Sequence, residues 1–191
     1  KMLKLKCVKS DLTEWKKIIQ TVYHPKGKIT VGIVGKYVDH QDAYKSVYEA
    51  LQHGTIANGY ELEIKKIESD QIKDYSLRKS HLHDCDGYII PGGFGERGWE
   101  GKILAARYCR EHKIPYFGLC LGMQVLIVEF ARNVLKLPKA NSTEMNPSAK
   151  DPVISLLAEQ EDIEELGGTM RLGAYPCVLN PKSKAYAAYQ A

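Results

Sequence analysis

The segment Gly118–Gln124 constrains the fold more than any other part of the chain. It reads Gly-Leu-Cys-Leu-Gly-Met-Gln, follows a short apolar run at Ile114–Phe117, and opens a longer apolar run at Leu121–Leu135. This order predicts a strand, a tight turn and a helix that begins at once. The glycines two residues to either side of Cys120 allow so sharp a turn without side-chain clashes. We therefore expect Cys120 at the tip of a strand–turn–helix.

A turn of this kind is typical of a nucleophile elbow. The free N–H groups and the positive dipole end of the following helix would favour a thiolate at Cys120 over a thiol. A buried structural cysteine between two turn glycines has the same spacing. Of these two interpretations, we favour the nucleophile.

Strands and helices alternate through most of the chain. Asp42 is placed to cap a helix over residues 43–58, and Asn58-Gly59 is placed to end it. Strands are expected at 29–35, 60–67, 86–90 and 114–117, and helices at 43–58, 99–112 and 121–135. This pattern predicts an α/β fold of the flavodoxin-like type: an open, mostly parallel sheet with helices on both faces and working groups at the strand carboxyl ends.

The two ends of the chain give weaker signals. Asp11 is placed to cap a short helix that runs through Gln20. Residues 1–27 are too few to form a core, so we expect them to pack on something else. Periodicity also weakens beyond Pro138. The expectations there are a loop around 141–144, an acidic surface at 159–165 and a hairpin strand at 169–179.

Composition excludes several classes of protein. Hydrophobic residues make up 44% of the chain, charged residues 26%, and the net charge is +4, but the basic residues form no stripe for nucleic acid. No apolar run approaches the ~20 residues of a membrane span, and no signal-peptide core follows the N-terminus. The five cysteines have neither paired nor metal-like spacing. These features predict a cytoplasmic protein without a metal site, a nucleic-acid partner or a membrane.

The glycines of Pro91–Gly95 lie at the end of a predicted strand. They would allow a backbone N–H to approach a reacting carbonyl, so the N–H groups of Gly93 and Leu121 could hold a developing oxyanion. A plain glycine-rich turn fits the same residues. No Gly-Lys-Ser/Thr follows, which excludes a P-loop, and Gly32–Gly35 lacks the dinucleotide-binding spacing.

A cysteine nucleophile usually needs a histidine base that a carboxylate orients. None of the six histidines has a position or neighbour that marks it as this base. They are His24, His40, His53, His81, His83 and His112. The sequence thus supplies a nucleophile without an evident base.

Several segments are distinctive when taken together. They are Pro91–Gly95, Gly118–Gln124, Asn141–Glu144 and Leu166–Gly173, with Val34–Val38 and Asp42–Ser46 in support. The first two are similar to class I (triad-type) glutamine amidotransferases in general. As a set, the segments resemble the CTP synthase family, in its C-terminal glutamine amidotransferase domain. By this resemblance, residues 1–27 are the end of a synthetase (amidoligase) domain with its interdomain linker, and residues 28–191 are the amidotransferase domain, C-terminally incomplete.

The resemblance implies a glutaminase. Cys120 would attack the side-chain amide of L-glutamine, form a γ-glutamyl thioester and release ammonia. Gly93 and Leu121 would supply the oxyanion N–H groups, and Glu144 would suit the substrate ammonium. The resemblance also assigns substrate-binding positions to Gly122, Met123, Gln124 and Glu144.

Family members pass the ammonia to the synthetase domain of the same polypeptide, which aminates ATP-activated UTP to CTP in pyrimidine biosynthesis. The resemblance therefore implies ATP, UTP, Mg²⁺ and the activator GTP for a full-length homotetramer, and no cofactor on this chain. The loop Phe94–Gly98, with Arg97, resembles a lid tied to GTP activation. A solvated arginine is the alternative.

One departure from the family is serious. Its catalytic histidine and glutamate lie in a His-x-Glu motif, and this chain contains none. We therefore expect the chain by itself to be an impaired glutaminase at best and to form no CTP. Two other classes stay open: a stand-alone γ-glutamyl hydrolase or DJ-1/PfpI-type thiol protein, and a non-catalytic binding module.

Overall fold

The protein is described by a computed structural model that covers residues 10–40, 42–77, 81–157, 173–174 and 176–189. Its contacts divide the chain into two compact units, residues 1–156 and 157–191. The predicted boundary near residue 28 stays a prediction. Within the described residues, no helix is both long enough and apolar enough to span a membrane.

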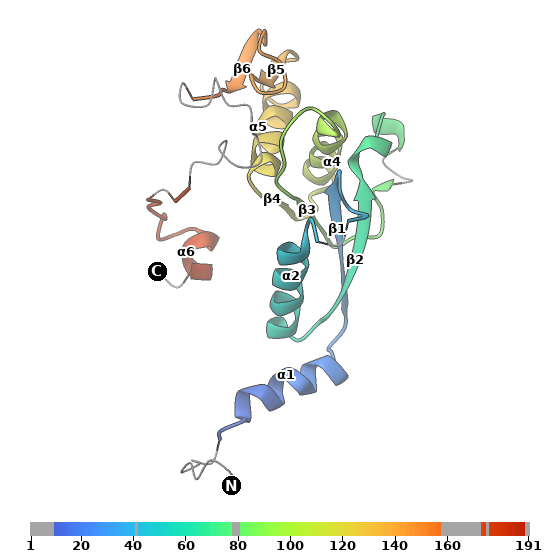
Figure 1. The fold of residues 1–191 in the computed structure, drawn as a ribbon, viewed down its shortest axis with the longest axis vertical. Helices are drawn as coiled ribbons and strands as arrows, with labels where there is room; N and C mark the ends of the chain where they lie inside the picture. Colours follow the sequence, from blue (N-terminus) through green and yellow to red (C-terminus); the bar gives the residue numbers. More distant parts are fainter. Residues whose placement is uncertain (1–9, 41, 78–80, 158–172, 175, 190–191) are drawn as a thin grey trace. The chain divides into compact units, whose positions relative to one another are not determined.

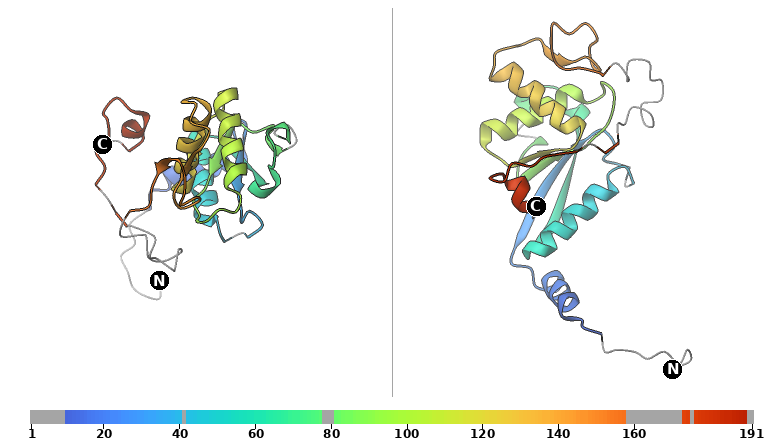
Figure 2. Two further views of the ribbon diagram at one scale, coloured as in Figure 1. Left: turned by 90° about the horizontal axis from the view of Figure 1, so that it is seen from above. Right: turned by 90° about the vertical axis from the view of Figure 1, so that its left-hand side faces the viewer.

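A four-stranded parallel sheet forms the centre of the first unit. Its strands are β1 (Lys28–Gly35), β2 (Glu61–Glu68), β3 (Gly87–Ile90) and β4 (Tyr116–Gly118), in the order β2-β1-β3-β4. Helix α2 (Lys45–Asn58) lies on one face, and α4 (Trp99–His112) and α5 (Leu121–Asn133) lie on the other (Figures 1 and 2). The predicted α/β architecture of the flavodoxin-like type is confirmed.

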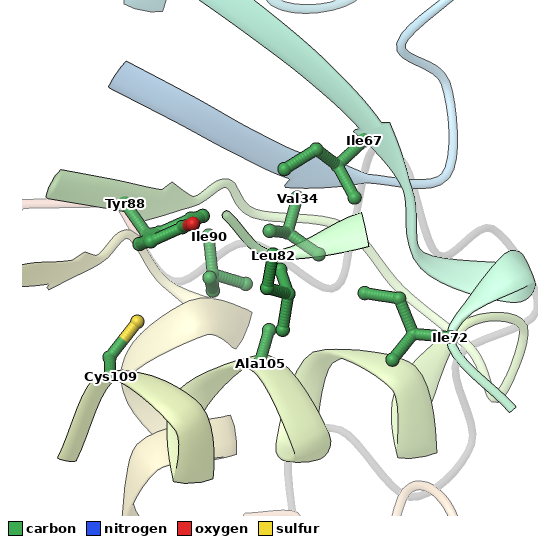
Figure 3. Close-up of a cluster of buried hydrophobic side chains, with 8 residues drawn as sticks. All are labelled: Val34, Ile67, Ile72, Leu82, Tyr88, Ile90, Ala105 and Cys109. Atoms are coloured by element: carbon green, nitrogen blue, oxygen red, sulfur yellow. The ribbon is translucent and has the colours of Figure 1, made fainter. Parts of the chain in front are cut away.

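Alternating side chains of the strands form two cores. Ile33 and Ile89 point to the α2 face and pack in a cluster with Tyr44. Val34 and Ile90, one residue further along each strand, point to the other face. There they join a cluster that includes Tyr88, Leu82, Ala105 and Cys109 (Figure 3). A strand buried on both faces reads as a continuous apolar run, which is why β1 was predictable from sequence.

The predicted helix ends are only partly correct. Gly59 ends α2 in the left-handed conformation with φ 87°, as Asn58-Gly59 predicted. The Asp42 cap is wrong, because Tyr44 is the N-cap residue and no side chain caps this helix. Asp11 does accept a hydrogen bond from the Thr13 N–H at 3.0 Å. It precedes the N-cap of α1 (Thr13–Tyr23), which extends past the predicted end at Gln20.

Structure after α5 departs most from expectation. The predicted loop around 141–144 contains β5 (Ala140–Ser142), which pairs in parallel with β6 (Asp151–Ile154). These strands are too short for a period of two to be visible, and they pair with each other rather than with the main sheet. Short 3₁₀ helices, η1 (Ser69–Gln71) and η2 (Tyr75–Leu77), were also not predicted.

Residues 157–191 form the second unit, which contains α6 (Lys184–Tyr189). The predicted hairpin strand at 169–179 is wrong where the structure describes it, because 173–174 and 176–179 have no strand conformation. The acidic segment 159–165 and most of the motif Leu166–Gly173 lie outside the described residues.

Candidate active site

Cys120 has the backbone of a nucleophile elbow. Its φ is 53° and its ψ is −108°, a conformation that residues with a side chain rarely adopt. It lies between the end of β4 and the start of α5, its side chain is exposed, and its carbonyl accepts the N–H of Met123 at 3.0 Å. The strained turn thus presents the thiol at the carboxyl edge of the sheet.

Both flanking glycines are required by close backbone contacts. A Cβ on Gly122 would lie 2.0 Å from the carbonyl oxygen of Ile90, and one on Gly118 would lie 2.4 Å from the carbonyl carbon of Gly122. The Tyr116 hydroxyl also donates to the Gly122 carbonyl at 2.6 Å. The elbow is therefore packed directly on β3 and β4, with no space for side chains at these positions.

The other cysteines have less suitable surroundings. Burial raises the pKa of the Cys109 thiol to about 12, and burial also raises the pKa of Cys85. Thiols of this kind stay protonated and unreactive near neutral pH. Cys120, by contrast, is exposed at the N-terminus of a 13-residue helix. Cys177 belongs to the second unit, and Cys7 lies outside the described residues.

The Pro-Gly-Gly loop lies directly beside the elbow. Strand β4 pairs with β3, and the Leu119 N–H donates to the Ile90 carbonyl at 3.0 Å. A Cβ on Gly92 would lie 3.4 Å from the Cβ of Cys120. A Cβ on Gly93 would lie 3.9 Å from the Leu121 side chain. The structure thus brings Gly93 next to Leu121 and Gly92 next to Cys120. The oxyanion role of the Gly93 and Leu121 N–H groups stays a prediction.

The predicted substrate-binding residues lie around the same edge. Gly122 is buried, and Met123 is half exposed in the first turn of α5. The side-chain oxygen of Gln124 is buried and accepts no hydrogen bond from any described residue, so it is available to a donor such as an amino-acid substrate. Their binding roles stay predictions.

Glu144 reaches the site from the segment after β5. Its Oε1 accepts the Gly95 N–H at 2.8 Å. The predicted ligand for the substrate ammonium is therefore also a contact of the Pro-Gly-Gly loop. Nearby, the indole N–H of Trp99 donates to Asn141 Oδ1 at 3.0 Å, which joins α4 to the same segment.

Two cationic side chains hold this loop: Arg97, which the sequence resemblance links to GTP, and Lys36, which the sequence did not single out. Lys36 Nζ donates to the Phe94 carbonyl, and the Arg97 guanidinium donates to the Lys36 carbonyl. Arg97 also pairs with Asp70 at 3.0 Å and lies over the Tyr37 ring, 4.9 Å from its centroid. Arg97 is thus held by neighbours on this chain, and its link to GTP stays a prediction.

Lys102 is a second buried lysine close to the loop. Its side chain is fully buried, and its Nζ has no hydrogen-bond partner among the described residues. Burial is the main cause that lowers its pKa from 10.5 to about 8. The charges of Lys36 and Arg97 act in the same direction, and that of Asp70 opposes them.

No histidine in the described part of the chain hydrogen-bonds to the Cys120 thiol. His83 pairs instead with Asp84 at 2.5 Å, and His112 bonds to the Tyr108 carbonyl at 3.0 Å. The described arrangement is an exposed thiol on a strained turn beside a glycine-rich loop, which is the setting that acyl transfer by a cysteine nucleophile requires.

Comparisons with known proteins agree with this chemistry. A family model described as "Glutamine amidotransferase class-I" matches residues 39–190. A CTP synthase of Protochlamydia amoebophila is 61% identical over 182 residues, which cover 94% of this chain and 33% of that protein. A CTP synthase of Carboxydothermus hydrogenoformans is 52% identical over 189 residues, 99% of this chain and 35% of that protein. The chain thus spans about a third of the length of these curated relatives.

A solved structure is similar as well. The glutaminase domain of Trypanosoma brucei CTPS, with bound acivicin, superposes with a TM-score of 0.64 at 38% identity. The match covers 70% of this chain and 52% of that chain.

Proposed function

The chain belongs to the class-I glutamine amidotransferase family, and from this we propose that it is the glutaminase part of a CTP synthase, which hydrolyses L-glutamine through Cys120. The observation that carries the proposal is the strained backbone of Cys120, which presents an exposed thiol beside the Pro-Gly-Gly loop. The similarity to a glutaminase domain supports the choice of substrate.

The proposed reaction begins with attack of the Cys120 sulfur on the carbonyl carbon of the glutamine side chain. The carbonyl oxygen gains negative charge, which the N–H groups of Gly93 and Leu121 stabilise; each such donor contributes on the order of 10²–10³ in rate. Collapse of the tetrahedral intermediate breaks the C–N bond, and the nitrogen leaves as ammonia after it takes up a proton. Water then hydrolyses the thioester to glutamate and restores the thiol.

Cys120 presents its exposed thiol at the N-terminus of α5, next to the groups proposed to bind the substrate. Glu144 and the unpaired side-chain oxygen of Gln124 are the groups we assign to the amino-acid end of the substrate. A carboxylate is suited to an ammonium group because the hydrogen bond is charge-assisted.

The relatives are about three times as long as this chain, so the wider activity is a proposal about a longer polypeptide. We propose that the ammonia passes to a synthetase domain that aminates UTP with ATP and Mg²⁺, in a GTP-activated cytoplasmic homotetramer. Those nucleotides and the metal are assigned to the synthetase domain, and GTP to the neighbourhood of the Phe94–Gly98 loop. None of them takes part in the thioester chemistry.

Covalent labelling tests the glutaminase proposal. Diazo-oxonorleucine, an electrophilic glutamine analogue, is expected to add one label to the chain, detected by intact mass, and none to Cys120→Ala. L-glutamine should protect the thiol, whereas a γ-glutamyl peptide should not, which separates this function from a γ-glutamyl hydrolase. If iodoacetamide alkylates Cys120 but the analogue does not, the site does not recognise glutamine and the binding-module interpretation takes its place.

A further inference from the structure

One peptide group of the Pro-Gly-Gly loop is held from both sides by charged side chains. The carbonyl of Phe94 accepts a hydrogen bond from Lys36 Nζ, and the N–H of Gly95, in the same peptide plane, donates to Glu144 Oε1 at 2.8 Å. The ammonium and the carboxylate thus bind opposite ends of a single peptide dipole. Charge-assisted bonds of this kind are about twice as strong as neutral ones, so the orientation of this peptide is fixed.

Lys36 is itself rigidly placed. It follows the last residue of β1, the strand that pairs with β3, and only 5% of its surface is exposed. Its backbone N–H donates to the hydroxyl of Tyr44 at 3.3 Å, and its carbonyl accepts from Arg97. A lysine on a flexible loop would lose much side-chain entropy on making such a contact. Here the buried strand end has already fixed its position.

The stem of Lys36 also lies against the predicted oxyanion donor. A Cβ on Gly93 would lie 3.5 Å from Lys36 Cε, with the Leu121 side chain 3.9 Å away. Gly93 is therefore packed against the lysine stem, while the lysine ammonium holds the Phe94–Gly95 peptide, two peptide groups beyond the one that carries the Gly93 N–H. Loss of the ammonium would leave the Phe94–Gly95 peptide free to rotate. The direction of the Gly93 N–H would then no longer be fixed.

We propose that Lys36 is a positioning residue of the glutaminase reaction, which orients the oxyanion donor Gly93 by fixing the Phe94–Gly95 peptide. The inference rests on the proposed function and adds to it a residue that does not touch the substrate. Oxyanion stabilisation depends on donors fixed before the reaction begins. A misplacement of about 1 Å can cost about 10²-fold in rate.

Lys102 provides a matched control. It is also buried and lies close enough to Lys36 for their charges to interact, but its Nζ has no acceptor among the described residues. Replacement of either lysine by methionine removes one buried positive charge and keeps the apolar stem. Only the Lys36 replacement removes the contact to the loop.

The test measures saturation kinetics of Cys120 labelling by diazo-oxonorleucine, whose ketone oxygen takes the place of the substrate amide oxygen. In Lys36→Met we expect the maximal labelling rate to fall by about tenfold or more, with the half-saturating concentration within about twofold of wild type. Lys36→Arg, which keeps the charge and a donor, should recover to within about threefold of wild type. Lys102→Met should label as wild type does.

Iodoacetamide separates positioning from general damage, since this small alkylating agent needs no oxyanion donor. Lys36→Met should react with it at the wild-type rate. The inference is overturned if the labelling rate of Lys36→Met equals that of wild type, or if both reagents slow in parallel. Lys36→Gln, whose amide nitrogen ends one bond short of the position of Lys36 Nζ, gives the same comparison if the methionine variant does not fold. Absence of labelling in the wild type would instead refute the proposed function.

Discussion

At the scale of single residues, the site depends on a backbone conformation that is locally unfavourable. The left-handed φ of Cys120 costs on the order of 1–3 kcal/mol for a residue with a side chain. The surrounding packing imposes this conformation, because the backbone of Gly118 lies against that of Gly122, and the backbone of Gly122 lies against Ile90 of β3. The residue that bears this strain is also the exposed thiol of the proposed chemistry.

Lys102 offers a residue-scale prediction about pH. Its amine gives up a proton near pH 8 in the folded protein and near 10.5 in the unfolded chain. Between these values the unfolded state binds more protons, so the contribution of Lys102 to stability rises with pH. Below about pH 8 the amine is charged in both states and its burial cost is fully present. Lys102→Met should therefore be more stable than wild type at pH 7.

Urea unfolding between pH 7 and 10.5 measures this effect. The advantage of Lys102→Met should shrink by on the order of 3 kcal/mol across this range, the size that the pKa difference implies. The exposed Lys73→Met serves as control and should follow wild type at every pH. Parallel stability curves for Lys102→Met and wild type would show that the buried amine is not desolvated.

At the scale of secondary structure, α4 and α5 are joined by a charged contact. Glu129 of α5 is fully buried and accepts three hydrogen bonds from Arg110 of α4, at 2.8–3.0 Å. The side chain of Asn133 also donates to Glu129 at 3.1 Å. A buried carboxylate needs such partners to offset its desolvation. The pair therefore fixes the register of the helix that begins at Cys120.

Glycines in two helices should respond in opposite ways to the same substitution. Gly122→Ala places a Cβ 2.0 Å from the Ile90 carbonyl oxygen, so we expect a loss of about 1–3 kcal/mol in the free energy of unfolding and loss of Cys120 labelling. Gly54→Ala, at an exposed position of α2 with no atom within 4 Å of the new Cβ, should gain about 0.5–1 kcal/mol.

Chemical denaturation of the two variants, together with diazo-oxonorleucine labelling, checks this pair. Gly54→Ala should label as wild type does. A folded, fully labelled Gly122→Ala protein would contradict the requirement for glycine after the nucleophile.

Many of the elements could be predicted from local patterns. The bounds of α4 agree with the prediction, and the strands of the main sheet agree to within a few residues. The failures have local causes as well. Asp42 was chosen as a cap from its residue type, but the chain makes a further turn before α2 begins at Lys45. Strands β5 and β6 form because they pair with each other. They are only three and four residues long, so an alternation of polar and apolar residues cannot be recognised in them.

At the scale of the whole molecule, α1 contributes little to the first unit. It has no buried residue. Large apolar side chains along it remain at least 38% exposed, namely Leu12, Trp15, Ile18, Ile19, Val22 and Tyr23. A helix that buries so little adds little to the free energy of unfolding. The expectation that residues 1–27 pack on something else stays a prediction.

A shortened chain that starts at Lys26 tests this point. It removes α1 and keeps the Lys26 nitrogen, then the terminal amine, as a donor to the Gly59 carbonyl, which the Lys26 N–H contacts at 2.8 Å in the intact chain. We expect its melting temperature to stay within about 3 °C of the intact chain, because a change of about 1 kcal/mol shifts the midpoint of a protein of this size by 2–4 °C. A larger decrease in calorimetry would show that α1 is part of the cooperative unit and that the predicted boundary near residue 28 is wrong.

The sequence by itself determined the strand–turn–helix at Cys120, the alternation of strands and helices, and the loop that carries Gly93. Each follows from constraints within a few residues, such as glycine spacing and apolar periodicity, which act before any distant contact forms. Tertiary structure alone decided how that loop is held. Lys36 and Phe94 are 58 residues apart, and Gly95 and Glu144 are 49 apart. Lys36 meets Phe94 because the parallel sheet gathers the ends of β1 and β3 at one edge, whereas Glu144 reaches Gly95 from the segment after β5, outside that sheet. Nothing local in the sequence marks either pair.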